Sequence, residues 1–125
     1  MATVKRFEDL ECWKASQELI IAIYKICKKE QIRKDYSLSD QIKRASVSVS
    51  NNIVEGFERI SRKEFKRFLS IANGSCSEVK NMIYVTKNLS FINKEEFNEL
   101  MDICQKTQNL IKGLIRYLYS LEQTK

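Results

Sequence analysis

The 125-residue chain contains no histidine and no proline, and it has only three glycines. Without histidine, acid–base chemistry would have to rest on carboxylates, lysine or tyrosine. The carboxylate–histidine pairs that hold metals in helical bundles are also excluded. With no proline and few glycines, tight turns are scarce and long helices are favoured. These absences predict a largely helical chain that lacks the usual catalytic side chains.

The four cysteines are scattered and form no CxxC pair. Zinc ligands normally come in close pairs, so we expect these cysteines to be small core residues. No apolar run approaches the ~20 residues that a membrane span needs. The N-terminus, MATVKRFEDLE, lacks the apolar core of a signal peptide. We therefore expect a cytoplasmic protein without a structural metal.

Composition and periodicity indicate one globular all-α domain over residues 1–125. Hydrophobic residues make up 43% and charged residues 30%, which is typical of folded domains. Apolar residues recur every three to four positions, as in the helices of a bundle. We predict an antiparallel up-and-down four-helix bundle with helices at about 9–29, 38–59, 62–89 and 94–121.

Polar residues mark where these helices begin. Ser37 with Asp40, Ser61 with Glu64, and Asn93 with Glu96 each have the spacing of a helix N-cap and its acidic partner. The polar segment 30–36 is predicted to be the first connection. The connection before Ser61 is very short, so the second and third helices are expected to be antiparallel neighbours.

The second predicted helix contains many residues of low helix propensity, so its neighbours must stabilise it. Ala45, Val49 and Gly56 share one side of it and would let another helix approach closely. Gly74 falls inside the third helix, where an interior glycine costs ~1 kcal/mol against alanine. We expect close packing against another helix to offset that cost.

A possible polar cluster follows in the same helix. Asn52 lies on the apolar seam, while Glu55 and Arg59 have the i, i+4 spacing of an ion pair. We predict that these three residues form an internal polar latch that fixes the packing. A ligand-binding role for Glu55 is the less favoured alternative, and an exposed pair would contribute only ~0.2–0.5 kcal/mol.

The net charge of +6 is concentrated in the middle of the chain. Residues 25–67 contain 12 Lys or Arg against 6 Asp or Glu, and the remainder is neutral. Such an excess suits a polyanion, an acidic protein or an anionic membrane surface, or it is simply a solvated face. No nucleic-acid-binding motif accompanies it. The candidate binding residues are Lys43, Arg44, Arg59, Arg62, Lys63, Lys66 and Arg67.

No motif indicates catalysis. Gly56 and Gly74 lack the spacing of a phosphate-binding loop, and Ser75 and Ser77 have no histidine partner. We therefore expect no enzymatic activity, no cofactor and no metal. A carboxylate-based enzyme centred on Glu55 remains a distant alternative.

Three segments together form a specific motif: FEDLECWKASQEL, QIKRASVSVSNNIVEGFER and SRKEFKRFLSIANGSCSEV. They resemble the bacterial four-helix-bundle family named after 23S rRNA intervening sequences, over nearly the whole chain. The residues that carry the resemblance are Asp9, Leu10, Trp13, Lys14, Gln41, Arg44, Ala45, Ser48, Asn52, Ile53, Glu55, Gly56, Arg59, Glu64, Phe65, Phe68, Leu69, Ala72, Gly74, Ser75 and Glu78. Val54 stands where the family usually has alanine, and a proline often found before the second helix is absent.

The resemblance implies a bundle that assembles as a ring-like homopentamer with no established enzymatic activity. Such proteins are encoded in ribosomal RNA gene insertions or elsewhere in bacterial genomes. A related group comprises accessory proteins of diversity-generating retroelements, which are basic pentamers that bind nucleic acid and a reverse transcriptase. Wide apolar faces on the first and last helices independently fit an oligomer.

Two hypotheses about function follow. The first is a homo-oligomer that binds RNA or DNA through its basic surface. The second is an assembly or adaptor protein that docks an acidic protein, such as a reverse transcriptase-type enzyme, without touching nucleic acid.

Overall fold

The computed structural model describes residues 4–123, which are all-α and contain no strand. The elements are a 3-10 helix η1 (Phe7–Asp9) and five α-helices. The α-helices are α1 (Glu11–Ile26), α2 (Glu30–Lys34), α3 (Tyr36–Phe57), α4 (Arg62–Asn88) and α5 (Lys94–Gln123). The all-α fold class predicted from the sequence is confirmed.

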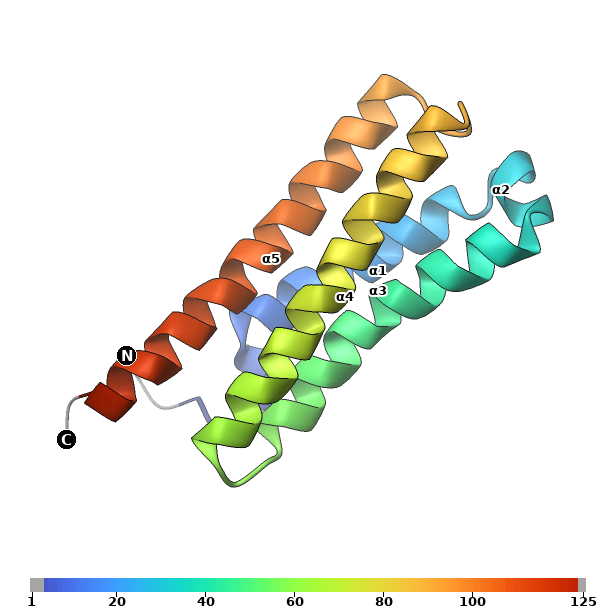
Figure 1. Ribbon diagram of the computed structural model, residues 1–125. Helices are drawn as coiled ribbons and strands as arrows, with labels where there is room; N and C mark the ends of the chain where they lie inside the picture. The colour runs from blue at the N-terminus through green and yellow to red at the C-terminus, as the bar shows by residue number, and fades with distance from the viewer. Residues whose placement is uncertain (1–3, 124–125) are drawn as a thin grey trace.

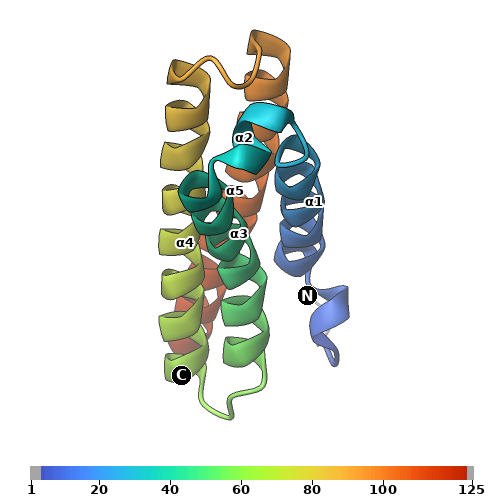
Figure 2. The same cartoon turned by 90° about the vertical axis from the view of Figure 1, so that its right-hand side faces the viewer.

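The long helices lie side by side along one axis (Figures 1 and 2). Helix α3 contacts α1 and α4, and α5 likewise contacts α1 and α4. The turn between α3 and α4 lies at one end of the molecule (Figure 1). Helix α2 and the connection between α4 and α5 lie toward the opposite end. Each end therefore has its own set of exposed side chains.

One continuous apolar core runs between these helices. Its fully buried members come from every long helix, and burying such a side chain contributes ~1.5–3 kcal/mol. They include Leu19, Ile23, Ile42, Val49, Ile53, Leu69, Val79, Ile83 and Ile111. A second row on α5 is half-buried against this core: Ile103, Leu110, Leu114, Tyr117 and Leu121.

Side-chain caps fix the starts of α4 and α5. Ser61 Oγ accepts a hydrogen bond from the Glu64 backbone N–H at 3.0 Å. Asn93 Oδ1 accepts from the Glu96 N–H at 2.7 Å, and Glu96 Oε1 accepts from the Asn93 N–H at 2.9 Å. Glu96 also accepts from Lys29 Nζ at 2.7 Å, so one carboxylate joins the start of α5 to the segment after α1.

The first connection differs from its prediction. Segment 30–36 was expected to be an irregular polar link, but it contains α2, which is held by Ile32, only 1% exposed. Helix α3 starts at Tyr36, and its cap is Asp35 rather than Ser37. Asp35 Oδ1 accepts from the Leu38 N–H at 3.1 Å, so the true cap lies two residues earlier.

Gly56 is a point of close approach between α3 and α4. A Cβ added there would lie 2.7 Å from Phe68 Cβ and 3.2 Å from the Phe65 carbonyl oxygen. The small-residue contact predicted for this helix is therefore confirmed at Gly56. The same expectation is wrong for Gly74 within this chain, since a Cβ there would meet nothing within 4 Å.

We expect Gly56→Ala to lower the free energy of unfolding by about 1–3 kcal/mol, because α4 must move away to make room. Gly113→Ala in α5 is the matched control. The nearest atom to its added Cβ is Arg116 Nη2 at 3.8 Å, an ordinary contact at the end of a flexible side chain. Urea denaturation of both variants measures the difference. Equal stability of the two would contradict the close helix contact.

Candidate nucleic-acid interface

The predicted basic residues do not form one site. Lys43 and Arg44 lie in the first half of α3, whereas Arg62, Lys63, Lys66 and Arg67 lie in the first two turns of α4. At 1.5 Å per helical residue, the length of α3 between Arg44 and Arg59 separates the groups by about 20 Å. The two clusters occupy opposite ends of the bundle.

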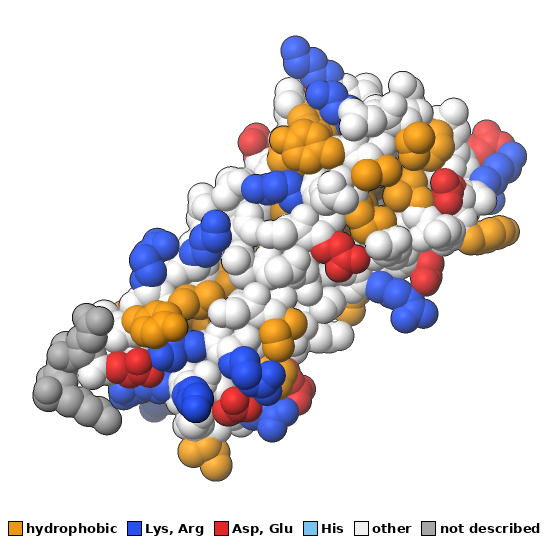
Figure 3. Space-filling model, in the orientation of Figure 1, with side chains coloured by type: hydrophobic (Ala, Val, Ile, Leu, Met, Phe, Trp, Pro, Cys, Tyr) orange, Lys and Arg blue, Asp and Glu red, His pale blue; other side chains and the backbone are white. Residues whose placement is uncertain are grey.

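Carboxylates neutralise much of the cluster on α4. Arg67 donates two hydrogen bonds to Glu64, at 3.0 and 3.1 Å. This hydrogen-bonded pair raises the pKa of Arg67 and lowers the pKa of Glu64. Lys66 donates to Glu122, and its side chain is only 12% exposed. Figure 3 shows acidic and basic side chains mixed at this end of the molecule.

The predicted polar latch is wrong for Glu55 and Arg59. Arg59 does donate to Glu55 at 2.9 Å, but both side chains are about half exposed (46% and 57%). Asn52 turns instead to its own helix, where Nδ2 donates to the Ser48 carbonyl at 2.8 Å and to Ser48 Oγ at 3.1 Å. The Asn52 hydrogen bonds and the Glu55–Arg59 ion pair are therefore separate and do not form one polar cluster.

An aromatic ring organises the arginines at this end. The guanidinium carbons of Arg59 and Arg67 lie 5.0 and 4.5 Å from the centroid of the Phe68 ring. Each arginine therefore has both a carboxylate and an aromatic partner inside the chain. A phosphate binding here would have to compete with the carboxylates of Glu55 and Glu64.

We expect Glu55→Gln to change the free energy of unfolding by no more than about 0.5 kcal/mol, since exposed i, i+4 pairs contribute little. Thermal or urea unfolding at low and high salt measures the effect. A loss of several kcal/mol would instead indicate that Glu55 and Arg59 form a buried, stabilising pair, against their observed exposure.

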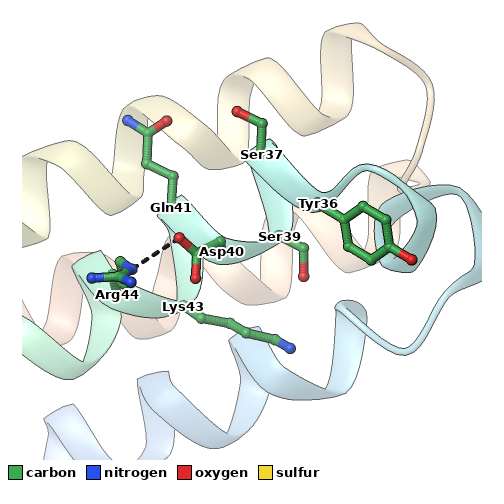
Figure 4. Close-up of a pocket in the computed structure, with 7 residues that line it drawn as sticks. All are labelled: Tyr36, Ser37, Ser39, Asp40, Gln41, Lys43 and Arg44. Carbon is green, nitrogen blue, oxygen red and sulfur yellow. Dashed lines mark hydrogen bonds and ion pairs between the residues drawn. The ribbon is translucent and has the colours of Figure 1, made fainter.

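The other basic cluster surrounds a shallow depression of about 710 Å³ on α3 (Figure 4). Its lining residues are Tyr36, Ser37, Ser39, Asp40, Gln41, Lys43 and Arg44. Arg44 Nε donates to Asp40 at 2.8 Å. Figure 4 shows Lys43 extending toward α1 and Gln41 pointing toward α4. Lys43 Nζ lies 5.1 Å from the centroid of the Tyr24 ring on α1.

Most of the basic excess lies at this end. Residues 25–44 hold seven Lys or Arg against three Asp or Glu, whereas residues 55–67 hold five against three. Within residues 4–123, four of those seven cations form no ion pair: Lys25, Lys28, Arg33 and Lys43. At the α4 end, only Arg62 and Lys63 are unpaired in this way.

Sequence reasoning missed two residues of this end, Tyr24 and Tyr36. They are 42% and 83% exposed. Tyr24 falls within the first predicted helix, 9–29, and Tyr36 within the predicted connection, 30–36, and neither was named as a candidate binding residue. The available signal was their position in sequence: Tyr24 directly precedes the most basic part of the chain, residues 25–44, and Tyr36 lies within it.

A second hollow is an apolar groove of about 740 Å³. It lies where the start of α1 and the C-terminal half of α5 meet the turn between α3 and α4. Its apolar lining includes Leu10, Cys12, Phe57, Phe65 and Leu114, and Arg62 stands at its margin.

The cysteines are poorly suited to nucleophilic catalysis or metal binding. All four are buried, and burial raises the pKa of the Cys12 and Cys76 thiols to about 12 and that of Cys104 to about 11. Such thiols stay protonated near neutral pH and are poor nucleophiles and metal ligands. In the described part of the chain, no group of three His, Cys, Asp or Glu could hold a metal ion.

Residues 8–113 match the family described as 23S rRNA-intervening sequence protein. The chain belongs to this family. The resemblance carried by the three sequence segments is thus confirmed. No curated protein matches this intervening-sequence protein.

A similar solved structure comes from Bacteroides thetaiotaomicron, a protein with unknown function from the S23 ribosomal protein family. It is 25% identical to this intervening-sequence protein, with a TM-score of 0.76. The match covers 83% of this chain and 97% of the other. None of the helices within residues 4–123 is long and apolar enough to cross a membrane.

Proposed function

We propose that this intervening-sequence protein is a non-enzymatic, cytoplasmic homo-oligomer that binds RNA or DNA through a basic surface. In this proposal an antiparallel four-helix bundle is the repeating unit, and a homopentamer is the assembly. The cluster of unpaired cations where α1, α2 and α3 meet is the observation that carries the binding function.

Charge pairing favours this end of the bundle over the α4 end. When a cation without a carboxylate partner binds a phosphate, counterions are released from the nucleic acid and no ion pair within the protein is broken. Four such cations lie around α2, against two near the start of α4. The proposed binding surface therefore shifts from Arg62, Lys63, Lys66 and Arg67 toward Lys28, Arg33 and Lys43.

The outer face of α4 supports self-association. At 100° per residue, Ile71, Gly74, Val85 and Leu89 fall within one narrow stripe. The three apolar side chains are 38–50% exposed, and Gly74 leaves the helix backbone open to a close neighbour. A second copy packing here would offset the helix-weakening effect of Gly74, which no contact within residues 4–123 compensates.

The proposed binding function predicts a salt-dependent affinity for nucleic acid. In a gel-shift titration at low ionic strength, we expect the protein to bind labelled RNA or DNA, and the logarithm of the affinity to fall linearly with the logarithm of the salt concentration. Lys28→Glu with Lys43→Glu should weaken binding more than Arg62→Glu with Lys63→Glu, which is the matched control.

Absence of binding at low salt would refute the nucleic-acid function. Affinity capture after nuclease treatment then tests the adaptor alternative, since an acidic protein partner should survive the nuclease.

The proposed homo-oligomer predicts the particle mass in solution. Light scattering at micromolar concentration should report the mass of a homopentamer. Ile71→Arg should reduce that mass, because it places a charge on the outer stripe of α4. Ile60→Arg is the control, since Ile60 is fully exposed in the turn between α3 and α4, away from the stripe. A wild-type protein at the mass of one chain would refute the oligomer.

A further inference from the structure

Two exposed aromatic residues accompany the depression on α3: Tyr36 lines it, and Tyr24 contacts Lys43, another of its lining residues. Tyr36 is 83% exposed at the first position of α3, and Tyr24 is 42% exposed on α1. Tyrosine is enriched at binding interfaces, where its flat ring offers an apolar contact face to a ligand. Lys43 contacts the Tyr24 ring and lines the depression together with Tyr36.

Lys43 joins the two tyrosines into one site. Its Nζ lies 5.1 Å from the centroid of the Tyr24 ring, and its side chain lines the depression together with Tyr36. Tyr36 and Lys43 are seven residues apart, or about 10 Å along the axis of α3. Lys28 lies four residues after Tyr24, in the turn that follows the end of α1 at Ile26.

The balance of charge at the site is positive. Asp40 is the carboxylate that lines the depression, and Arg44 already neutralises it at 2.8 Å. Lys28 and Lys43 have no ion pair within residues 4–123. An anion approaching the depression therefore meets Lys43, which has no carboxylate partner, and a carboxylate that is already paired, with Lys28 in the turn after α1 as a further unpaired cation.

We propose that Tyr36, Lys43 and Tyr24 form a binding site for single-stranded nucleic acid, in which bases stack on the tyrosine rings and lysines contact the phosphates. Aromatic platforms beside cations are the usual means of binding single strands, because every unpaired base offers a face for stacking. A duplex keeps its bases stacked on one another and would use only the lysines. An acidic protein would likewise gain little from the rings.

This inference rests on the proposed nucleic-acid function and names its substrate as single-stranded. Fluorescence anisotropy with a labelled oligonucleotide of about 16 nucleotides, and with the duplex of the same sequence, tests it. We expect the wild-type protein to bind the single strand more tightly than the duplex. Tyr36→Leu should weaken single-strand binding at least about fivefold while leaving duplex binding unchanged. Tyr36→Phe should restore the affinity, since it keeps the ring.

Tyr119→Leu is the matched control. Tyr119 is 53% exposed on α5 and also lies beneath a lysine, with Lys66 Nζ 3.9 Å from its ring centroid. Because it belongs to the other end of the bundle, its loss should not change single-strand affinity. Light scattering measures the particle mass of Tyr36→Leu, which we expect to equal that of the wild-type protein.

The outcomes separate the two proposals. If the wild-type protein binds nucleic acid but Tyr36→Leu does not alter the affinity for the single strand, the tyrosine site is wrong and the proposed function stands. Equal weakening of single-strand and duplex binding would also refute stacking. A changed mass would assign Tyr36 to a contact between copies, against this proposal. Absence of binding to both probes would refute the function and the site together.

Discussion

The contact between α3 and α4 at Gly56 is the constraint on which the rest of the structure depends. Helix α3 contains many serine and asparagine residues, and it persists because neighbouring helices bury its apolar side. Gly56 lets the backbone of α3 approach Phe65 and Phe68 more closely than any side chain would allow. This contact fixes how α3 lies on α4, and thereby where the charged residues of both helices emerge.

That packing sorts the basic residues into two populations. Near the start of α4, arginines rest on Phe68 and pair with Glu55 and Glu64, so they serve the fold. Near α2, Lys25, Lys28, Arg33 and Lys43 form no ion pair within residues 4–123, and Lys43 rests on the exposed ring of Tyr24. Position in sequence did not distinguish these populations, because both lie in the same basic stretch. The side chains that each basic residue contacts in the folded structure distinguish the two populations.

The helical class, the caps at Ser61 and Asn93, and the family could be read from the sequence because each depends on local pattern or on a specific motif. Other features depend on contacts that no local pattern encodes. The sequence indicated Ser37 as the cap of α3, whereas the folded chain uses Asp35, directly after the short helix α2 in which Ile32 is buried. Glu55 has the spacing of an ion pair in either environment, so only the observed packing shows that it is exposed.

The placement of Lys43 over Tyr24 has an entropic consequence. Immobilising a lysine side chain costs up to about 2 kcal/mol of rotamer freedom. Lys43 is half-buried and already rests on an aromatic ring in the free chain, so part of that freedom is lost on folding rather than on binding. The ring holds the ammonium group without neutralising it, as a carboxylate would. Lys43 is thus a preorganised cation that retains its full charge for an incoming ligand.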